Sequence, residues 1–261
     1  MLQIENLSVR LGRRPILQDV SLTTRAGEVL AVCGANGAGK STLLKAVLQE
    51  HPAQGTIRLN GRDLASCRPH TLAALRAVVP QDTEIAFGFT LGEIVAMGRQ
   101  AGSAAHETEI DALALAAVGL QGREGEDVRT LSGGERQRGH LARALAQVWH
   151  PVGPEGPCWL MLDEPVSSLD LGQQLKVMQL ARGFADAGGG VIAVMHDLNL
   201  SAMFADRLAF LVDGHLAALG PPDSVLQEPL LSRAYDCHVA LNRLPATGPW
   251  LLPQTCTLRG D

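Results

Sequence analysis

The chain has 261 residues, of which 46% are hydrophobic and 19% charged, a composition that favours a packed globular fold over a disordered chain. Its formal net charge is -5, which disfavours a nucleic-acid-binding protein. No apolar run approaches the ~18 residues needed to cross a bilayer, and the N-terminus lacks the basic start and apolar stretch of a signal peptide. We therefore expect a cytosolic protein.

Two runs in which apolar and polar residues alternate open the chain. The apolar positions are Leu2, Ile4, Leu7 and Val9 in the first run, and Ile16, Leu17, Val20 and Leu22 in the second. Alternation with a period of two is typical of strands that have one face open to solvent. The sequence therefore predicts an antiparallel sheet at the N-terminus.

Three later runs, at residues 29–33, 159–162 and 191–195, are apolar throughout, as expected for strands buried on both faces. Segments rich in Ala and Leu lie between them and predict helices at residues 110–118, 140–148 and 175–185. Buried strands that alternate with helices predict an α/β fold with a mainly parallel sheet.

Residues 88–147 contain no buried strand and are expected to form an inserted helical subdomain. Residues 122–127 and 152–157 are rich in Gly, Pro and charge, and we expect loops there. Residues 242–261 hold three prolines, and no element is predicted for them.

A glycine-rich segment at residues 34–41 fits the pattern G-x-x-x-x-G-K-[ST], directly after a buried strand and before a helical run at residues 42–49. Glycines let the backbone curl so that amide groups surround phosphates, and a helix N-terminus adds its dipole. Lys40 would then reach the β- and γ-phosphates, and the Ser41 hydroxyl would hold Mg²⁺. The expected nucleotide contacts are Gly34, Ala35, Asn36, Gly37, Ala38, Gly39, Lys40, Ser41 and Thr42.

Two carboxylates, Asp163 and Glu164, follow the second buried strand. In an open α/β sheet, ligands bind at that end of the strands. Asp163 would bind Mg²⁺ directly or through water, and Glu164 would accept a proton from the attacking water or hold that water in line. An acidic pair after a strand is also common as a helix N-cap, so the interpretation depends on the phosphate loop.

Residues 131–138 read L-S-G-G-E-R-Q-R before a helical run. Ser132 and Glu135 have the spacing of a capping box. Gly133 and Gly134 each cost helix stability of ~1 kcal/mol relative to Ala, which capping does not require. Bare backbone at a helix N-terminus instead favours close approach to an anion.

Together these motifs resemble the ATP-binding subunit of an ABC transporter, in the order typical of that family and over essentially the whole chain. The resemblance adds the Q-loop glutamine Gln81, the D-loop residue Asp170 and the switch histidine His196. It implies that Gln81 and His196 sense the γ-phosphate and Mg²⁺. The implied catalytic residues are Glu164, His196, Gln81 and Lys40, and the implied Mg²⁺ ligands are Ser41, Gln81 and Asp163.

The resemblance also implies a head-to-tail dimer of two copies of the chain. Each ATP would lie between the phosphate loop of one subunit and Ser132, Gly133 and Gly134 of the other. ATP binding would close the dimer, and hydrolysis would open it. The expected organisation is a single ATP-binding domain over 1–261, with a core at 1–87 and 158–240, a helical subdomain at 88–157 and a tail at 241–261.

Residues 86–99 and 196–200 resemble the importers of iron-siderophores, cobalamin and haem. Phe87 and Phe89 fall where this family receives the permease, although ordinary core packing explains them equally well. Asp163 follows Ser132 by 31 positions, roughly eight more than is usual in the family, and the excess has the composition of a loop. An extension at residues 149–157 is similar to that of haem-import ATPases and favours haem.

The implied function is ATP hydrolysis that energises haem import at the cytoplasmic face of the inner membrane. The implied partners are a polytopic permease dimer and, through it, a periplasmic or surface substrate-binding protein. Three alternatives stay open: an iron-siderophore or cobalamin importer, a soluble ABC ATPase of iron–sulfur assembly, and a nucleotide-binding regulator without turnover. The presence of Glu164 and His196 argues against the regulator.

The sequence departs from the family at the position expected to stack on adenine, which is Leu11 here. No Phe, Tyr or Trp precedes Phe87. Base–aromatic stacking contributes ~1–3 kcal/mol. We expect one of three arginines near this position to lie over the base instead; they are Arg10, Arg13 and Arg14.

Overall fold

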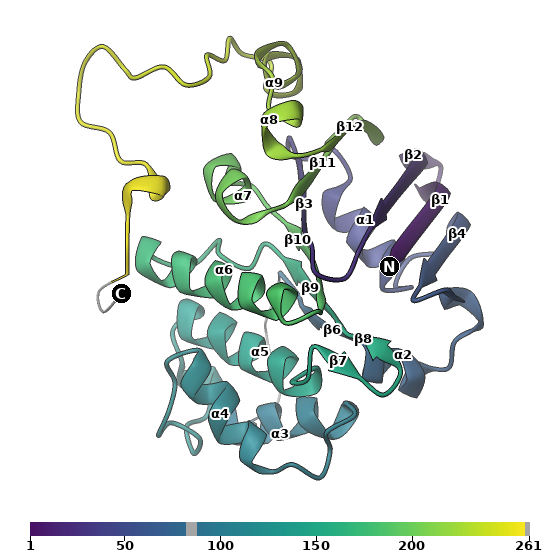
Figure 1. Cartoon of the computed structure of the whole chain (residues 1–261), viewed down its shortest axis with the longest axis vertical. Coiled ribbons are helices and arrows are strands. Elements are labelled where there is room, and N and C mark those ends of the chain that lie inside the picture. The colour runs from purple at the N-terminus through teal and green to yellow at the C-terminus, as the bar shows by residue number, and fades with distance from the viewer. Residues whose placement is uncertain (82–87, 259–261) are drawn as a thin grey trace.

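The computed structural model describes residues 1–81 and 88–258 (Figure 1). An antiparallel sheet in the order β2-β1-β4-β5 contains the N-terminus. Its strands are β1 (Leu2–Leu11), β2 (Arg14–Thr24), β4 (Ala53–Leu59) and β5 (Arg62–Asp63). The residues Leu2, Ile4, Leu7 and Val9 point into the core, which confirms the alternation predicted from the sequence.

A six-stranded sheet in the order β12-β11-β3-β10-β9-β6 forms the centre. Its strands are β3 (Val29–Gly34), β6 (Arg76–Val79), β9 (Trp159–Asp163), β10 (Gly190–Val194), β11 (Arg207–Val212) and β12 (His215–Gly220). All pairs are parallel except β11 with β12. The three predicted buried strands are β3, β9 and β10, every residue of which is buried. The α/β fold with a mainly parallel sheet is confirmed.

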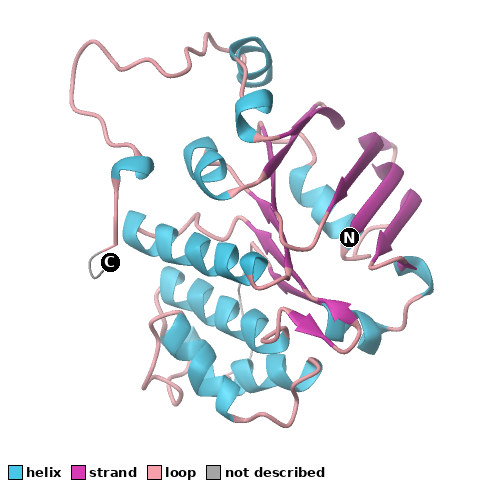
Figure 2. Ribbon diagram, in the orientation of Figure 1, coloured by secondary structure: helices cyan, strands magenta, loops and turns pink. Residues whose placement is uncertain are grey.

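The helices lie mainly on one side of the central sheet, opposite the antiparallel strands (Figure 2). They include α3 (Leu91–Ala101), α4 (Glu109–Ala117), α5 (Gly133–Gln147) and α6 (Leu171–Asp186). The described part of residues 88–147 contains no strand, as predicted. Shorter elements are α1 (Lys40–Val47), η1 (Leu64–Ser66), α2 (Pro69–Leu75), η2 (Val128–Thr130), α7 (Leu198–Phe204), α8 (Pro222–Val225), α9 (Glu228–Tyr235) and η3 (Pro253–Thr255).

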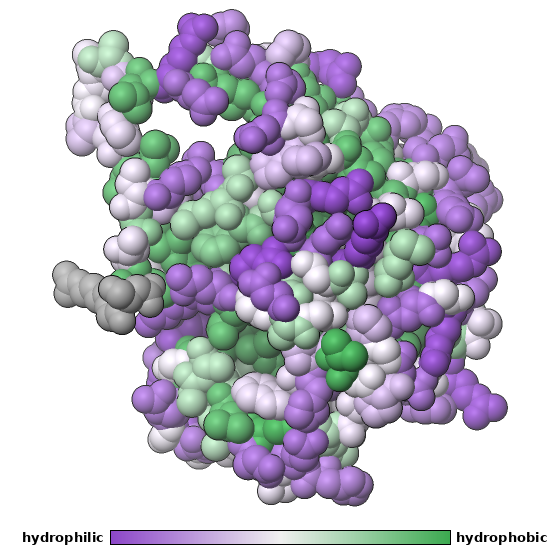
Figure 3. All heavy atoms as spheres, viewed as in Figure 1, coloured by the Kyte–Doolittle hydropathy of each residue, from purple (hydrophilic) through white to green (hydrophobic). Residues whose placement is uncertain are grey.

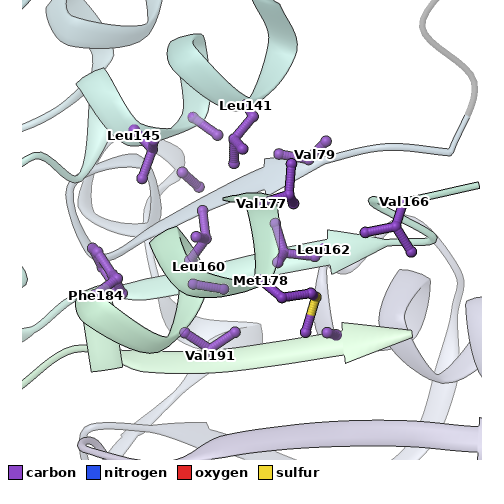
Figure 4. Packing of buried hydrophobic residues seen from close by; sticks show 14 of the residues in the cluster. Val79, Leu141, Leu145, Leu160, Leu162, Val166, Val177, Met178, Phe184 and Val191 are labelled. Atoms are coloured by element: carbon purple, nitrogen blue, oxygen red, sulfur yellow. The ribbon is translucent and has the colours of Figure 1, made fainter. Parts of the chain in front are cut away.

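The central sheet separates two hydrophobic clusters, and β9 contributes to both. Leu160 and Leu162 point toward α5 and α6, where they pack in one cluster with Leu145 and Phe184 (Figure 4). Trp159 and Met161 point to the opposite face of the strand and belong to the other cluster, which the antiparallel sheet covers. This double burial explains why the strand sequence is apolar throughout.

The loop predicted at residues 152–157 is wrong, because this segment forms an antiparallel hairpin of β7 (Val152–Gly153) and β8 (Gly156–Pro157). The hairpin is attached to the antiparallel sheet. Asn60 Nδ2 donates to the Pro157 carbonyl at 2.8 Å, and Arg62 pairs with Glu155 at 2.5 Å. These contacts hold residues 152–157 in the hairpin, and the Gly and Pro content of the segment does not reveal them.

Beyond α9 the chain leaves the body of the molecule as an irregular segment and returns to it at η3 (Figure 1). The single turn η3 packs against α7. Within residues 1–81 and 88–258, none of the helices combines the length and the hydrophobicity that a membrane span requires.

Candidate active site

The connection from β3 to α1 depends on glycines in the left-handed region of backbone conformation. Gly34 has φ 142° and Gly39 has φ 103°. A Cβ on Gly34 would lie 2.3 Å from the carbonyl oxygen of Leu211, and a Cβ on Gly39 would lie 2.6 Å from Cδ2 of Leu17. Only glycine fits these two positions, so the tight curve of this loop is built into the sequence.

The buried ammonium of Lys40 holds this loop closed. Its Nζ donates to the carbonyl oxygens of Gly34 at 2.9 Å and Ala35 at 3.1 Å. Burial lowers the pKa of Lys40, whereas the nearby Glu164 carboxylate acts in the opposite direction. The first turn of α1 begins at the same place. Its N-cap residue is Gly39, which has no side chain that could cap the amide groups of this turn. The loop therefore offers a cation and free amides together.

A hydroxyl and a buried carboxylate meet next to the loop. Ser41 Oγ donates to Oδ1 of Asp163 at 3.1 Å, and Asp163 is only 4% exposed. Burial raises the pKa of Asp163, with the Ser41 hydrogen bond opposing the shift. No ion pair joins Asp163 to a side chain in the described ranges. Carboxylate and hydroxyl oxygens suit Mg²⁺, so these two residues fit such an ion.

Glu164 turns sharply away from the end of β9. Its backbone has φ 51°, and its amide donates to the Val194 carbonyl at 3.1 Å. Its side chain reaches His196, whose Nε2 lies 2.6 Å from Oε1 of Glu164. The Glu164 side chain is 14% exposed and that of His196 is 45% exposed, so the imidazole lies on the solvent side of the pair. The carboxylate is thus held in place and remains reachable by water.

Sequence reasoning missed one support of this turn. Gln137, on α5, donates from Nε2 to the backbone carbonyl of Glu164 at 3.0 Å. The bond joins positions 27 residues apart, and no local pattern marks it. It links the helix that begins after Ser132 to the turn that carries Glu164.

The predicted capping box at the start of α5 is confirmed. The Glu135 amide donates to Ser132 Oγ, and the Ser132 amide and hydroxyl donate to the Glu135 carboxylate at 2.9 Å and 2.7 Å. Together with the Arg123 guanidinium, which has the larger effect, these bonds lower the pKa of Glu135 to about 2. A Cβ on Gly133 would meet no atom within 4 Å. No neighbour among residues 1–81 and 88–258 therefore demands a glycine at position 133.

The remaining predicted residues lie around this cluster. Thr42 is half-buried in the first turn of α1. Gln81 is exposed in a bend just after β6. Asp170 is the N-cap of α6, and its Oδ1 accepts from the Gln173 amide at 2.9 Å.

Two phenylalanines, Phe87 and Phe89, follow the Q-loop glutamine in the sequence. Phe87 lies outside the described residues. Phe89 is partly buried and packs against the main hydrophobic cluster, as its interpretation as a core residue requires.

The structure thus brings together Lys40, Ser41, Asp163, Glu164 and His196 at the carboxyl ends of β3, β9 and β10, which are adjacent in the sheet. In an open parallel sheet this edge is where ligands bind. Among the described residues, no hydrogen bond or ion pair joins the Ser132–Gly134 segment to the phosphate loop.

The sequence pattern of the ABC transporter family matches residues 17–167, more than half of the chain. The chain belongs to the ABC transporter family. It is 51% identical over 261 residues to the hemin import ATP-binding protein HmuV of Jannaschia sp. (strain CCS1), covering 100% of this chain and 97% of that protein. The protein of the same name from Roseobacter denitrificans is 48% identical over 253 residues, with 97% of each covered.

Solved structures of other ABC proteins have the same fold. The ATP binding subunit of an ABC transporter superposes with a TM-score of 0.77, covering 92% of this chain and 95% of that chain, at 24% identity. A metal-chelate type ABC transporter in an inward-facing conformation gives a TM-score of 0.74 at 27% identity, covering 90% and 88%. The resemblance to an ABC ATP-binding subunit, and to the hemin import proteins in particular, is confirmed.

Proposed function

We propose that this chain is the ATP-hydrolysing subunit of a haem importer and drives transport through a separate membrane permease. The observation that carries hydrolysis is the 2.6 Å contact of Glu164 with His196, beside the Ser41–Asp163 hydrogen bond. The choice of haem is supported by full-length similarity to proteins named for hemin import.

Binding of ATP begins with an exchange of partners at Lys40. Its ammonium leaves the carbonyls of Gly34 and Ala35 and binds the β- and γ-phosphates, where charge-assisted hydrogen bonds are stronger than those to neutral carbonyls. The amides of the loop and of the first turn of α1 surround the phosphates. The residues proposed for these contacts are Gly34, Ala35, Asn36, Gly37, Ala38, Gly39, Lys40, Ser41 and Thr42.

Ser41, Asp163 and Gln81 are the residues proposed to hold Mg²⁺. When bound, the ion neutralises negative charge that develops on the phosphate oxygens. The buried Asp163 carboxylate forms no ion pair with a side chain among the described residues, which makes it a suitable ligand.

Glu164 is the proposed general base. Its carboxylate accepts a proton from the attacking water or holds that water in line with the γ-phosphate. His196 orients the carboxylate through Nε2 and contacts the γ-phosphate from its exposed side. Gln137 fixes the backbone of Glu164, so it is a positioning residue.

Two copies complete the sites in a head-to-tail dimer. Ser132, Gly133 and Gly134 of one copy contact the ATP held by the other, and Asp170 contributes from the D-loop. The open space around Gly133 supports this arrangement, because a phosphate group can approach the backbone there.

The permease is proposed to dock near Gln81 and Phe89, at the boundary of the core (1–87 and 158–240) with the helical subdomain (88–157). The chain would then be held at the cytoplasmic face of the membrane by its partner. A substrate-binding protein acts on it only through the permease. At the other end of the site, Leu11 is 45% exposed at the tip of the β1–β2 hairpin, and we place a neighbouring arginine over adenine.

The test is a pull-down of the tagged chain from gently solubilised membranes, followed by ATPase assays with and without a haem-loaded binding protein. We expect a polytopic permease to co-purify and haem to stimulate hydrolysis. Stimulation by only a siderophore or cobalamin carrier would correct the substrate. Recovery of soluble proteins alone would favour iron–sulfur assembly and overturn the transport function.

A further inference from the structure

Between α9 and η3 the chain presents apolar side chains to solvent. We call residues 242–252 the arch. Leu244 is 66% exposed, Trp250 47% and Leu251 70%, and this segment contains no helix or strand. Figure 3 shows apolar groups along the arch, at the upper left of that view. Several large apolar side chains exposed on one irregular segment indicate a surface that binds another molecule.

The arch is fixed at both of its ends. Before it, the Val239 amide donates to Ser232 Oγ at 3.0 Å, and the Leu241 amide donates to Oε1 of Glu228 at 2.9 Å. After it, Pro253 is buried, and Gln254 Nε2 donates to the Asn199 carbonyl at 3.4 Å. The arch therefore projects from a defined place on the subunit.

Its own subunit leaves space beneath it. A cavity of about 710 Å³ lies among helices α7 to α9 and the two ends of the arch, with Asn199, Glu228, Asn242 and Gln254 in its polar lining. A segment that spans such a space is not packed into the core. It can therefore move against another surface without opening the hydrophobic clusters.

The position of the arch relates it to the proposed dimer. Asn199, which contacts Gln254, follows His196 by three positions. Four residues of extended chain span at most about 14 Å, so Trp250 and Leu251 lie within about that distance of Gln254. Since His196 bonds to Glu164, the arch ends beside the face on which a second subunit would close.

We propose that the arch docks on the second copy of this chain, with Trp250 and Leu251 as anchors, and extends the dimer interface beyond the ATP sites. This inference rests on the proposed function, which includes the dimer. Trp is enriched among the residues that dominate binding at interfaces. In a two-fold symmetric dimer each arch contacts the other subunit, so each anchor residue contributes to the dimer interface twice.

A lipid surface is the less suitable occupant. The arch contains one cation, Arg243, and no acidic residue. Peripheral binding to anionic lipid usually requires clusters of Lys and Arg beside the apolar residues. Another copy of the chain demands no such cluster.

The test uses the full chain in the Glu164→Gln background, in which ATP and Mg²⁺ are expected to trap the dimer. Sedimentation then measures the dimer dissociation constant for the double variant Trp250→Ala/Leu251→Ala. The matched control is Leu113→Ala, which removes an apolar side chain of similar exposure, 49%, from α4. We expect the double variant to raise the dissociation constant about tenfold or more and the control to leave it unchanged.

A second readout follows Trp250 itself. The difference in emission between the chain and its Trp250→Phe variant isolates this indole from Trp149 and Trp159. We expect a blue shift and protection from a collisional quencher when ATP drives dimerisation. ATP affinity of the monomer should not change in any arch variant.

The outcomes separate the two proposals. A trapped dimer with an unchanged dissociation constant in the double variant overturns the arch proposal alone. Trp250-dependent binding to anionic vesicles, without an effect on the dimer, also overturns it and identifies lipid as the occupant. Failure of the Glu164→Gln chain to dimerise at all overturns the proposed dimer and the arch proposal together.

Discussion

The imidazole Nε2 of His196 lies 2.6 Å from Oε1 of Glu164, although 32 residues separate them in the sequence. They meet because each follows a strand, β10 and β9, and these strands are parallel neighbours. The carboxyl ends of parallel neighbours lie at one edge of the sheet. The topology, rather than any local motif, creates this pair.

Glu164→Gln should stop hydrolysis while preserving ATP binding. An amide cannot accept the proton of water, and general-base catalysis contributes ~10²–10⁴-fold, so we expect the rate to fall at least 100-fold. Single-turnover hydrolysis and nucleotide binding measure the two effects. Glu155→Gln on the exposed hairpin is the matched control and should hydrolyse normally. An equally slow Glu155→Gln would show that the assay reports folding.

Asp163→Asn should stabilise the fold near neutral pH. Because burial raises the pKa of Asp163, the folded chain holds this proton more tightly than the unfolded chain, and ionisation destabilises the folded state. That cost is present above the folded pKa and disappears as the pH falls through it.

We therefore expect a higher melting temperature for Asp163→Asn at about pH 7, measured without Mg²⁺, and a difference that shrinks toward about pH 3. Hydrolysis should be lost at about pH 7, where the unaltered chain is expected to be active. A variant that is less stable at neutral pH would contradict the assignment of burial as the dominant cause.

Two glycines should respond differently to alanine. Gly34→Ala drives a Cβ into the Leu211 carbonyl in a strained backbone conformation, and we expect a loss of stability of about 3 kcal/mol or more. Gly133→Ala meets open space and should change stability by less than about 1 kcal/mol.

Gly133→Ala should nevertheless slow hydrolysis by about tenfold, equivalent to ~1.4 kcal/mol, since the methyl group obstructs the partner's ATP. Urea unfolding and steady-state ATPase assays measure the two properties. Normal turnover in Gly133→Ala would argue against a nucleotide contact at this glycine.

Lys40→Ala should weaken ATP binding more than it weakens the fold. Charge-assisted hydrogen bonds contribute ~1.5–3 kcal/mol, so affinity should fall about 10- to 150-fold. Lys176→Ala removes a lysine on the exposed side of α6 and serves as the control. Isothermal titration with ATP compares them, and equal affinities would exclude Lys40 as a phosphate ligand.

The attachment of the β7–β8 hairpin can be measured through Asn60. Trp159 Nε1 donates to Asn60 Oδ1 at 3.2 Å, and Trp159 is fully buried. Asn60→Ala leaves this indole N–H unpaired and should cost ~1–3 kcal/mol. Arg62→Ala breaks only an exposed ion pair and should cost less than about 1 kcal/mol. Chemical unfolding compares the variants, and the opposite ranking would contradict this account.

The sequence revealed the strands whose burial pattern is simple. The strand β9 is apolar at every position before Asp163 because both of its faces are covered. By contrast, β6 begins at Arg76 immediately after α2 ends at Leu75, so no turn residue marks the change. The hairpin at residues 152–157 was missed because Val-Gly and Gly-Pro are weak strand sequences, and contacts from Asn60 and Arg62 hold it.

In the candidate site, too, local patterns could be predicted and contacts between distant residues could not. Its glycine loop and capping box are local patterns, so they could be predicted in detail. The bond from Gln137 to the Glu164 carbonyl joins an α-helix to a turn far along the chain. It depends on how α5 packs, which no local pattern contains.

The β7–β8 hairpin has a mechanical consequence. On one side it is bonded to Arg62 of the antiparallel sheet, and on the other His150, just before it, contacts Glu107 between α3 and α4 at 3.1 Å. The segment at residues 149–157 thus connects the helical part of the chain to the antiparallel sheet by two side-chain contacts. A displacement of helices α3 and α4 is therefore transmitted through the hairpin to β5, at the edge of the antiparallel sheet.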